Sequence, residues 1–135
     1  MGKSISSDSF LVQREAKDIY IFLSDFTNFS HLMPEQVQNW SATPDQCSFE
    51  IKGLATLGMR MIERLPFSKV VMEGEGKLPF DFKLSCHFEA EGETSTKVQL
   101  VMDADMNPFI SMMAENPMRD FINLLAARLK QVMES

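Results

Sequence analysis

The chain has 135 residues, of which 44% are hydrophobic and 24% charged, and its net charge is −6. These values are typical of one folded domain, here residues 1–135, that buries roughly two thirds of its unfolded surface in a single core. The negative charge argues against nucleic acid or an anionic membrane as the main partner, because both select basic surfaces. No apolar run is long enough to insert into a bilayer.

The first twelve residues are rich in serine and lack the apolar stretch of a secretory signal. Both cysteines, Cys47 and Cys86, fall on apolar positions of predicted strands. Two separate thiols without a secretion signal predict reduced core residues in a cytoplasmic protein.

The first elements are a strand over residues 4–12 and an amphipathic helix over residues 15–26, where apolar side chains recur every three or four residues. A short second helix carries Phe29 and Met33 and ends at Pro34. The period then changes to two, which predicts antiparallel strands with one buried and one solvated face. Six such strands are predicted, over residues 37–43, 47–51, 55–62, 69–76, 80–89 and 97–106.

The final element begins at Asn107 and Pro108, which are typical of a helix N-cap and first helical position. The same pair recurs at Asn116 and Pro117. We therefore expect a short helix up to Glu115, then a kink or restart, then a long amphipathic helix to Met133.

This order predicts an α+β domain: a curved, seven-stranded antiparallel sheet with two short helices between strands 1 and 2, wrapped around a long C-terminal helix. The chain resembles the START/pollen-allergen superfamily of helix-grip domains (SRPBCC), in the polyketide cyclase/dehydrase and lipid-transport branch. The resemblance covers nearly the whole chain. It is carried by pattern-level cues at residues 22–25, 28–29, 32–34, 80–82 and 107–108, and by Trp40.

The resemblance implies a hydrophobic small molecule or lipid bound between the sheet and the C-terminal helix. Eleven methionines fit such an adaptable interior, although an ordinary Met-rich core is the simpler alternative. The apolar residues expected to line the site are Phe29, Met33, Met59, Met61, Met72, Phe82, Leu84, Met102, Met106, Met112, Phe121 and Leu125.

Two charged residues join this list. Glu63 continues the inward parity of Met59 and Met61, so it is expected to anchor a polar group or act as a general base, unless a bulge reverses the parity. Arg128 lies one helical position from the apolar stripe and is expected to pair with Glu63 or a ligand carboxylate, unless its head stays in water.

No catalytic constellation is evident. His31 and His87 have no spaced partners for a metal, and neither cysteine has a flanking base, so no metal, cofactor or catalytic group is assigned. Ligand binding is the leading hypothesis. The alternatives are a cyclase or hydrolase that uses the same cavity, and a chaperone-activator-like interaction module that presents Met112 and Met113. The chain is expected to be a monomer or a homodimer.

Overall fold

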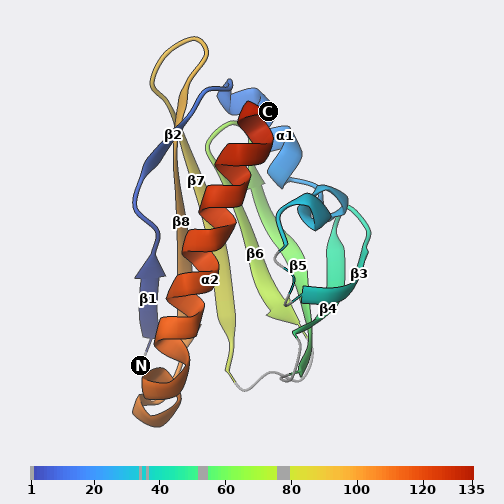
Figure 1. Cartoon of the computed structure of the whole chain (residues 1–135), viewed down its shortest axis with the longest axis vertical. Helices are drawn as coiled ribbons and strands as arrows, with labels where there is room; N and C mark the ends of the chain where they lie inside the picture. Colours follow the sequence, from blue (N-terminus) through green and yellow to red (C-terminus); the bar gives the residue numbers. More distant parts are fainter. Residues whose placement is uncertain (1, 34, 36, 52–54, 76–79) are drawn as a thin grey trace.

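One curved antiparallel sheet and one long helix make up most of the molecule (Figure 1). The computed structural model describes residues 2–33, 35, 37–51, 55–75 and 80–135. In chain order the elements are β1 (Gly2–Ser6), β2 (Phe10–Val12), α1 (Ala16–Leu23), η1 (Phe26–His31), β3 (Val37–Ala42), β4 (Gln46–Ile51), β5 (Ala55–Leu65), β6 (Lys69–Glu75), β7 (Phe82–Ala90), β8 (Thr96–Asp105) and α2 (Pro108–Glu134).

The strands form a sheet in the order β1-β8-β7-β6-β5-β4-β3, and β2 also pairs with β8. The predicted helix-grip architecture is therefore confirmed. The expected opening strand is two strands, which makes the sheet 8-stranded. Ser7 separates them: its backbone N–H donates to the Leu100 carbonyl at 2.9 Å, and its hydroxyl accepts from the Leu100 N–H at 3.0 Å.

The C-terminal helix α2 is continuous from Pro108 to Glu134, so of the expected kink or restart after Glu115 the restart does not occur. The Asn107 side chain caps it, because Oδ1 accepts from the Ile110 N–H at 2.9 Å. Pro117 lies inside the helix, where its ring removes one backbone donor. Among the described residues, no helix is long and apolar enough to cross a bilayer.

One face of α2 is buried against β1, β2 and β8. That face consists of Ile122, Leu125, Ala126, Leu129 and Met133. The C-terminal end of α2 is tied to the segment after β2, where Gln13 N–H donates to Glu134 Oε2 at 2.9 Å. Two hydrogen bonds lower the pKa of Glu134: the one from the Lys130 side chain has the larger effect, and the one from the Gln13 backbone the smaller.

Farther along the strand order, α1 lies against β6 and β7, and η1 lies against β3 and β4 (Figure 1). Four aromatic rings join η1 to these strands. Phe26 meets Phe29 at 5.0 Å between ring centroids, Phe29 stacks on Trp40 at 6.4 Å, and Trp40 stacks on Phe49 at 5.5 Å. The two short helices and α2 thus cover different parts of the inner face.

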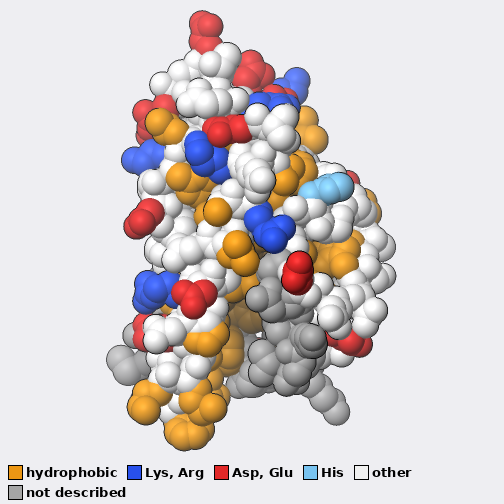
Figure 2. All heavy atoms as spheres, in the orientation of Figure 1, with side chains coloured by type: hydrophobic (Ala, Val, Ile, Leu, Met, Phe, Trp, Pro, Cys, Tyr) orange, Lys and Arg blue, Asp and Glu red, His pale blue; other side chains and the backbone are white. Residues whose placement is uncertain are grey.

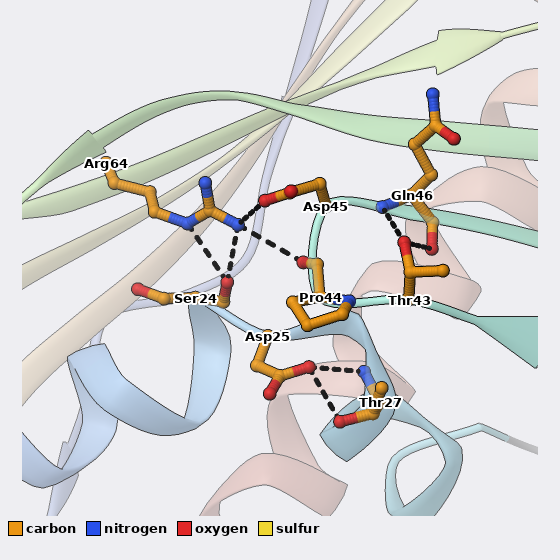
Figure 3. A network of polar contacts seen from close by, with 8 residues as sticks. All are labelled: Ser24, Asp25, Thr27, Thr43, Pro44, Asp45, Gln46 and Arg64. Atoms are coloured by element: carbon orange, nitrogen blue, oxygen red, sulfur yellow. Dashed lines mark hydrogen bonds and ion pairs between the residues drawn. The ribbon is translucent and has the colours of Figure 1, made fainter.

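Arg64 of β5 connects the α1–η1 junction to the turn between β3 and β4 (Figure 3). Its Nε and Nη2 donate to the Ser24 carbonyl at 3.0 and 2.9 Å. Nη2 also donates to the Pro44 carbonyl at 3.2 Å and contacts Asp45 Oδ1 at 2.7 Å. A single guanidinium therefore fixes three segments that are distant in the sequence.

We expect Arg64→Ala to lower the free energy of unfolding by about 1–2 kcal/mol, because charged hydrogen bonds to two carbonyls are lost from a partly solvated site. Arg64→Lys should lose less, since it keeps the charge but not the fork of donors. Urea denaturation measures both changes. The control is Arg60→Ala, which removes an exposed ion pair to Glu73. Equal losses in Arg60→Ala and Arg64→Ala would contradict this role.

Candidate functional site

Four of the predicted lining residues lie in one row across the inner face of the sheet. Met61 of β5 is opposite Met72 of β6, Met72 is opposite Leu84 of β7, and Leu84 is opposite Met102 of β8. Cross-strand partners share a face, so these side chains form a continuous apolar strip. It runs from β8, which packs against α2, to β5, farther across the sheet.

All of the predicted apolar residues except Met112 fall into two groups according to their exposure. One group is buried in the core and comprises Phe29, Met59, Met72, Leu84, Met102, Met106 and Leu125. The other group packs against that core but keeps part of its surface accessible, and comprises Met33, Met61, Phe82 and Phe121. The second group therefore keeps apolar surface accessible to solvent, whereas the first group is enclosed.

Partly covered apolar side chains also follow one side of α2. We call the set Ile110, Ala114, Met118, Phe121 and Val132 the half-buried flank. Successive members lie three or four residues apart, except for Val132, which lies eleven residues, or about three helical turns, after Phe121. They therefore share one side of the helix, next to the fully buried face. Of these five residues, only Phe121 was predicted from the sequence to line the site. The same apolar periodicity that predicted the helix was the available signal for Met118 and Val132.

Met112 was expected to line the interior, but the structure places its side chain at the surface. Its relative exposure is 85%, and Phe109 and Met113 beside it are also exposed. Because α2 runs through Pro117 without a restart, its phase is constant, and Met112 is two residues from both Ile110 and Ala114. A separation of two residues turns a side chain away from theirs. Hydrophobic atoms gather at this lower end of α2 (Figure 2).

Glu63 was expected on the inner face unless a bulge reversed the parity, and that bulge is observed. The register of β5 against β6 shifts between Met61 and Glu63, so that Glu63 pairs with Val71 and Arg64 pairs with the buried Val70. This bulge turns Glu63 outward, as one extra residue in a strand does. Its side chain is 51% exposed and contacts Lys69 Nζ at 2.9 Å. The charged residue that takes the inward position is Arg64.

Arg128 lies on α2 with its Nε buried and without a hydrogen-bond partner among the described residues. Its side chain is partly buried, between Leu125 and Val132 along the helix. The expected pair with Glu63 does not form, because Glu63 is bound to Lys69. Arg128 therefore brings an unpaired cation to the edge of an apolar surface.

The other candidate chemical groups are not arranged for catalysis. Cys47 and Cys86 are buried and free, as predicted, and burial raises the pKa of each thiol to about 12. Since the thiolate is the reactive form, neither is an activated nucleophile. His31 and His87 are exposed. Within the described ranges, no group of three or more His, Cys, Asp or Glu side chains could hold a metal ion.

Two hollows lined by described residues lie elsewhere on the molecule. The larger, of about 660 Å³, is open to solvent over β3, β4 and β5, and polar side chains such as Ser41, Gln46 and Thr56 line it. The smaller, of about 200 Å³, lies between the β1–β2 connection and the side of α2 that carries Asn123 and Lys130. A cavity between the half-buried flank and the sheet therefore stays a prediction.

No family model and no curated protein sequence matches the chain. Solved structures do match it. Norcoclaurine synthase from Thalictrum flavum, in complex with dopamine and hydroxybenzaldehyde, superposes with a TM-score of 0.72 at 14% identity, over 98% of this chain and 86% of that one. A START superfamily protein from Mycobacterium smegmatis gives 0.69 at 15% identity, over 96% and 98%. The di-domain aromatase/cyclase BexL of the BE-7585A biosynthetic pathway gives 0.66 at 16% identity, over 96% and 45%. At these identities the similarity shows the helix-grip fold.

Proposed function

From this fold, we propose that the chain binds a hydrophobic small molecule or lipid between α2 and the inner face of the sheet. The observation that carries the proposal is the half-buried flank of α2, together with partly covered apolar side chains on the sheet side, including Met61 and Phe82. Apolar surface that stays accessible can be removed from water by a ligand, which stabilises the complex by about 25 cal/mol per Å².

Two of the structural neighbours support this class of ligand. The norcoclaurine synthase structure contains two aromatic compounds, and the BexL protein is an aromatase/cyclase. We infer for this chain a ligand of similar apolar character, held in the cytoplasm, where the buried thiols of Cys47 and Cys86 remain reduced.

The test is direct binding to wild-type protein. Native mass spectrometry of protein purified without stripping is expected to show an additional bound mass. Titration with the neutral fluorophore N-phenyl-1-naphthylamine is expected to saturate at one molecule per chain. No bound mass and no saturable binding would overturn the proposal.

The cyclase or hydrolase alternative is weaker. Glu63, its intended acid–base group, lies at the surface in an ion pair with Lys69. A general base must reach the proton that it removes from a bound substrate, and this carboxylate faces the opposite side of the sheet.

A second candidate, an interaction module, is favoured by the exposed apolar side chains of Phe109, Met112 and Met113 at one end of α2. Such clusters mark contacts with other macromolecules. We propose self-association through this cluster as its simplest form. Sedimentation velocity should then show a dimer that the double variant Met112→Ser, Met113→Ser abolishes. A wild-type monomer at all accessible concentrations would contradict it.

A further inference from the structure

Arg128 differs from the other arginines in its partners. The remaining four all donate to a carboxylate or a carbonyl: Arg14 to Asp18 and the Met133 carbonyl, Arg60 to Glu73, Arg64 to Asp45 and two carbonyls, and Arg119 to Glu115. Arg128 Nε is buried and has no acceptor among the described residues.

No acidic residue lies one helical turn from Arg128 on either side. The positions one turn before it are Leu124 and Leu125, and those one turn after it are Gln131 and Val132. A guanidinium stays charged at any relevant pH, so deprotonation cannot relieve the burial of its donor. Buried donors in folded proteins almost always have an acceptor, and an arginine fork fits an oxyanion best.

The apolar side chains near Arg128 indicate the chemical character of the rest of a ligand whose anionic group binds there. Phe121 and Val132 of the half-buried flank lie seven residues before and four residues after Arg128, on the same side of α2. An anion bound at Arg128 would thus have its remaining atoms against apolar side chains. The net charge of −6 repels free anions in general, so a local cation is needed to retain one.

We propose that the ligand is an amphipathic organic acid, with its carboxylate, sulfonate or phosphate bound by Arg128 and its apolar part along the half-buried flank. This inference rests on the proposed function and specifies its ligand class. Arg128 acts as the anchor that fixes the polar end of the ligand, and apolar burial supplies the remaining affinity.

The experiment compares two probes that differ by one anionic group. They are 1-anilinonaphthalene-8-sulfonate and its neutral analogue N-phenyl-1-naphthylamine. In Arg128→Gln, the Kd of the sulfonate is expected to rise about tenfold, since a charged hydrogen bond is lost, while the Kd of the neutral probe changes less than about twofold. Arg128→Lys, which keeps the charge, should retain part of the preference.

The matched control is Arg119→Gln, on the same helix, where the exposed guanidinium is paired with Glu115. It removes the same charge and should leave both affinities within about twofold of wild type. Equal weakening of both probes by Arg128→Gln, or an unchanged sulfonate affinity, would overturn the anchor. If neither probe binds wild-type protein saturably, the proposed function itself fails. Circular dichroism of each variant verifies that the fold is retained.

Discussion

Replacing Leu129 with alanine is expected to lower the free energy of unfolding by about 2–5 kcal/mol, the range for a large aliphatic side chain removed from a core. Leu129 is 1% exposed, on the face of α2 that packs against the sheet. Truncation there leaves a cavity between the two layers. The change tests whether packing of α2 on the sheet is the main source of stability in this fold.

Leu124→Ala is the matched control for this variant. Leu124 is on the same helix but 38% exposed, so its truncation should cost less than about 1 kcal/mol. Both variants change helix propensity in the same way, so the difference between them reports burial alone. Urea denaturation gives the two values. A loss for Leu129→Ala no greater than that for Leu124→Ala would mean that this face is not where α2 docks.

Much of the architecture follows from periodicity in the sequence. Alternation of apolar and polar residues over 80–89 and 97–106 predicts two strands, and these are observed as β7 (Phe82–Ala90) and β8 (Thr96–Asp105). Periodicity does not show whether the helix continues through Pro117. An internal proline costs a helix about 3 kcal/mol, so the sequence favoured a break. Burial of Ile122, Leu125 and Leu129 stabilises α2 by more than that local cost, and only the assembled sheet provides that burial.

The two wrong site residues have separate physical causes. Glu63 was placed inward by strict alternation, and a bulge after Met61 adds one residue that reverses the parity. Local sequence does not encode this bulge clearly, because it depends on the register with β6. Met112 was placed inward by hydrophobicity alone. Its position within the period of α2 assigns it to the exposed side once the helix is known to be continuous.

The side chains that line the predicted site could be identified in part from the sequence. The apolar strip Met61–Met72–Leu84–Met102 follows from strand parity, and the structure brings the four together in register. The division into buried and partly covered side chains could not be read from the sequence, because it depends on how far α2 extends over the sheet. The missing acceptor for Arg128 likewise depends on which side chains pack around α2 in the folded chain.

Replacing Met61 with tryptophan is expected to weaken binding of N-phenyl-1-naphthylamine by more than about tenfold, because the larger ring occupies space that the ligand needs. Met61 is the partly covered end of the inner strip, so added bulk projects toward the proposed site. The buried Met102 is a less suitable position, since overpacking there would strain the core itself.

Ile62→Trp is the control, because Ile62 is the next residue in the chain, lies at the bulge and is 40% exposed. This variant introduces the same side chain outside the inner face. Its affinity for N-phenyl-1-naphthylamine should therefore stay within about twofold of that of the wild type. Fluorescence titration measures binding, and thermal unfolding verifies that both variants fold. Unchanged binding in a folded Met61→Trp protein would show that the ligand does not bind next to β5. An equal loss in both variants would indicate that the strand, and not the site, had been disturbed. Selective loss in Met61→Trp places the ligand against the inner face of the sheet, on the side that α2 leaves partly covered.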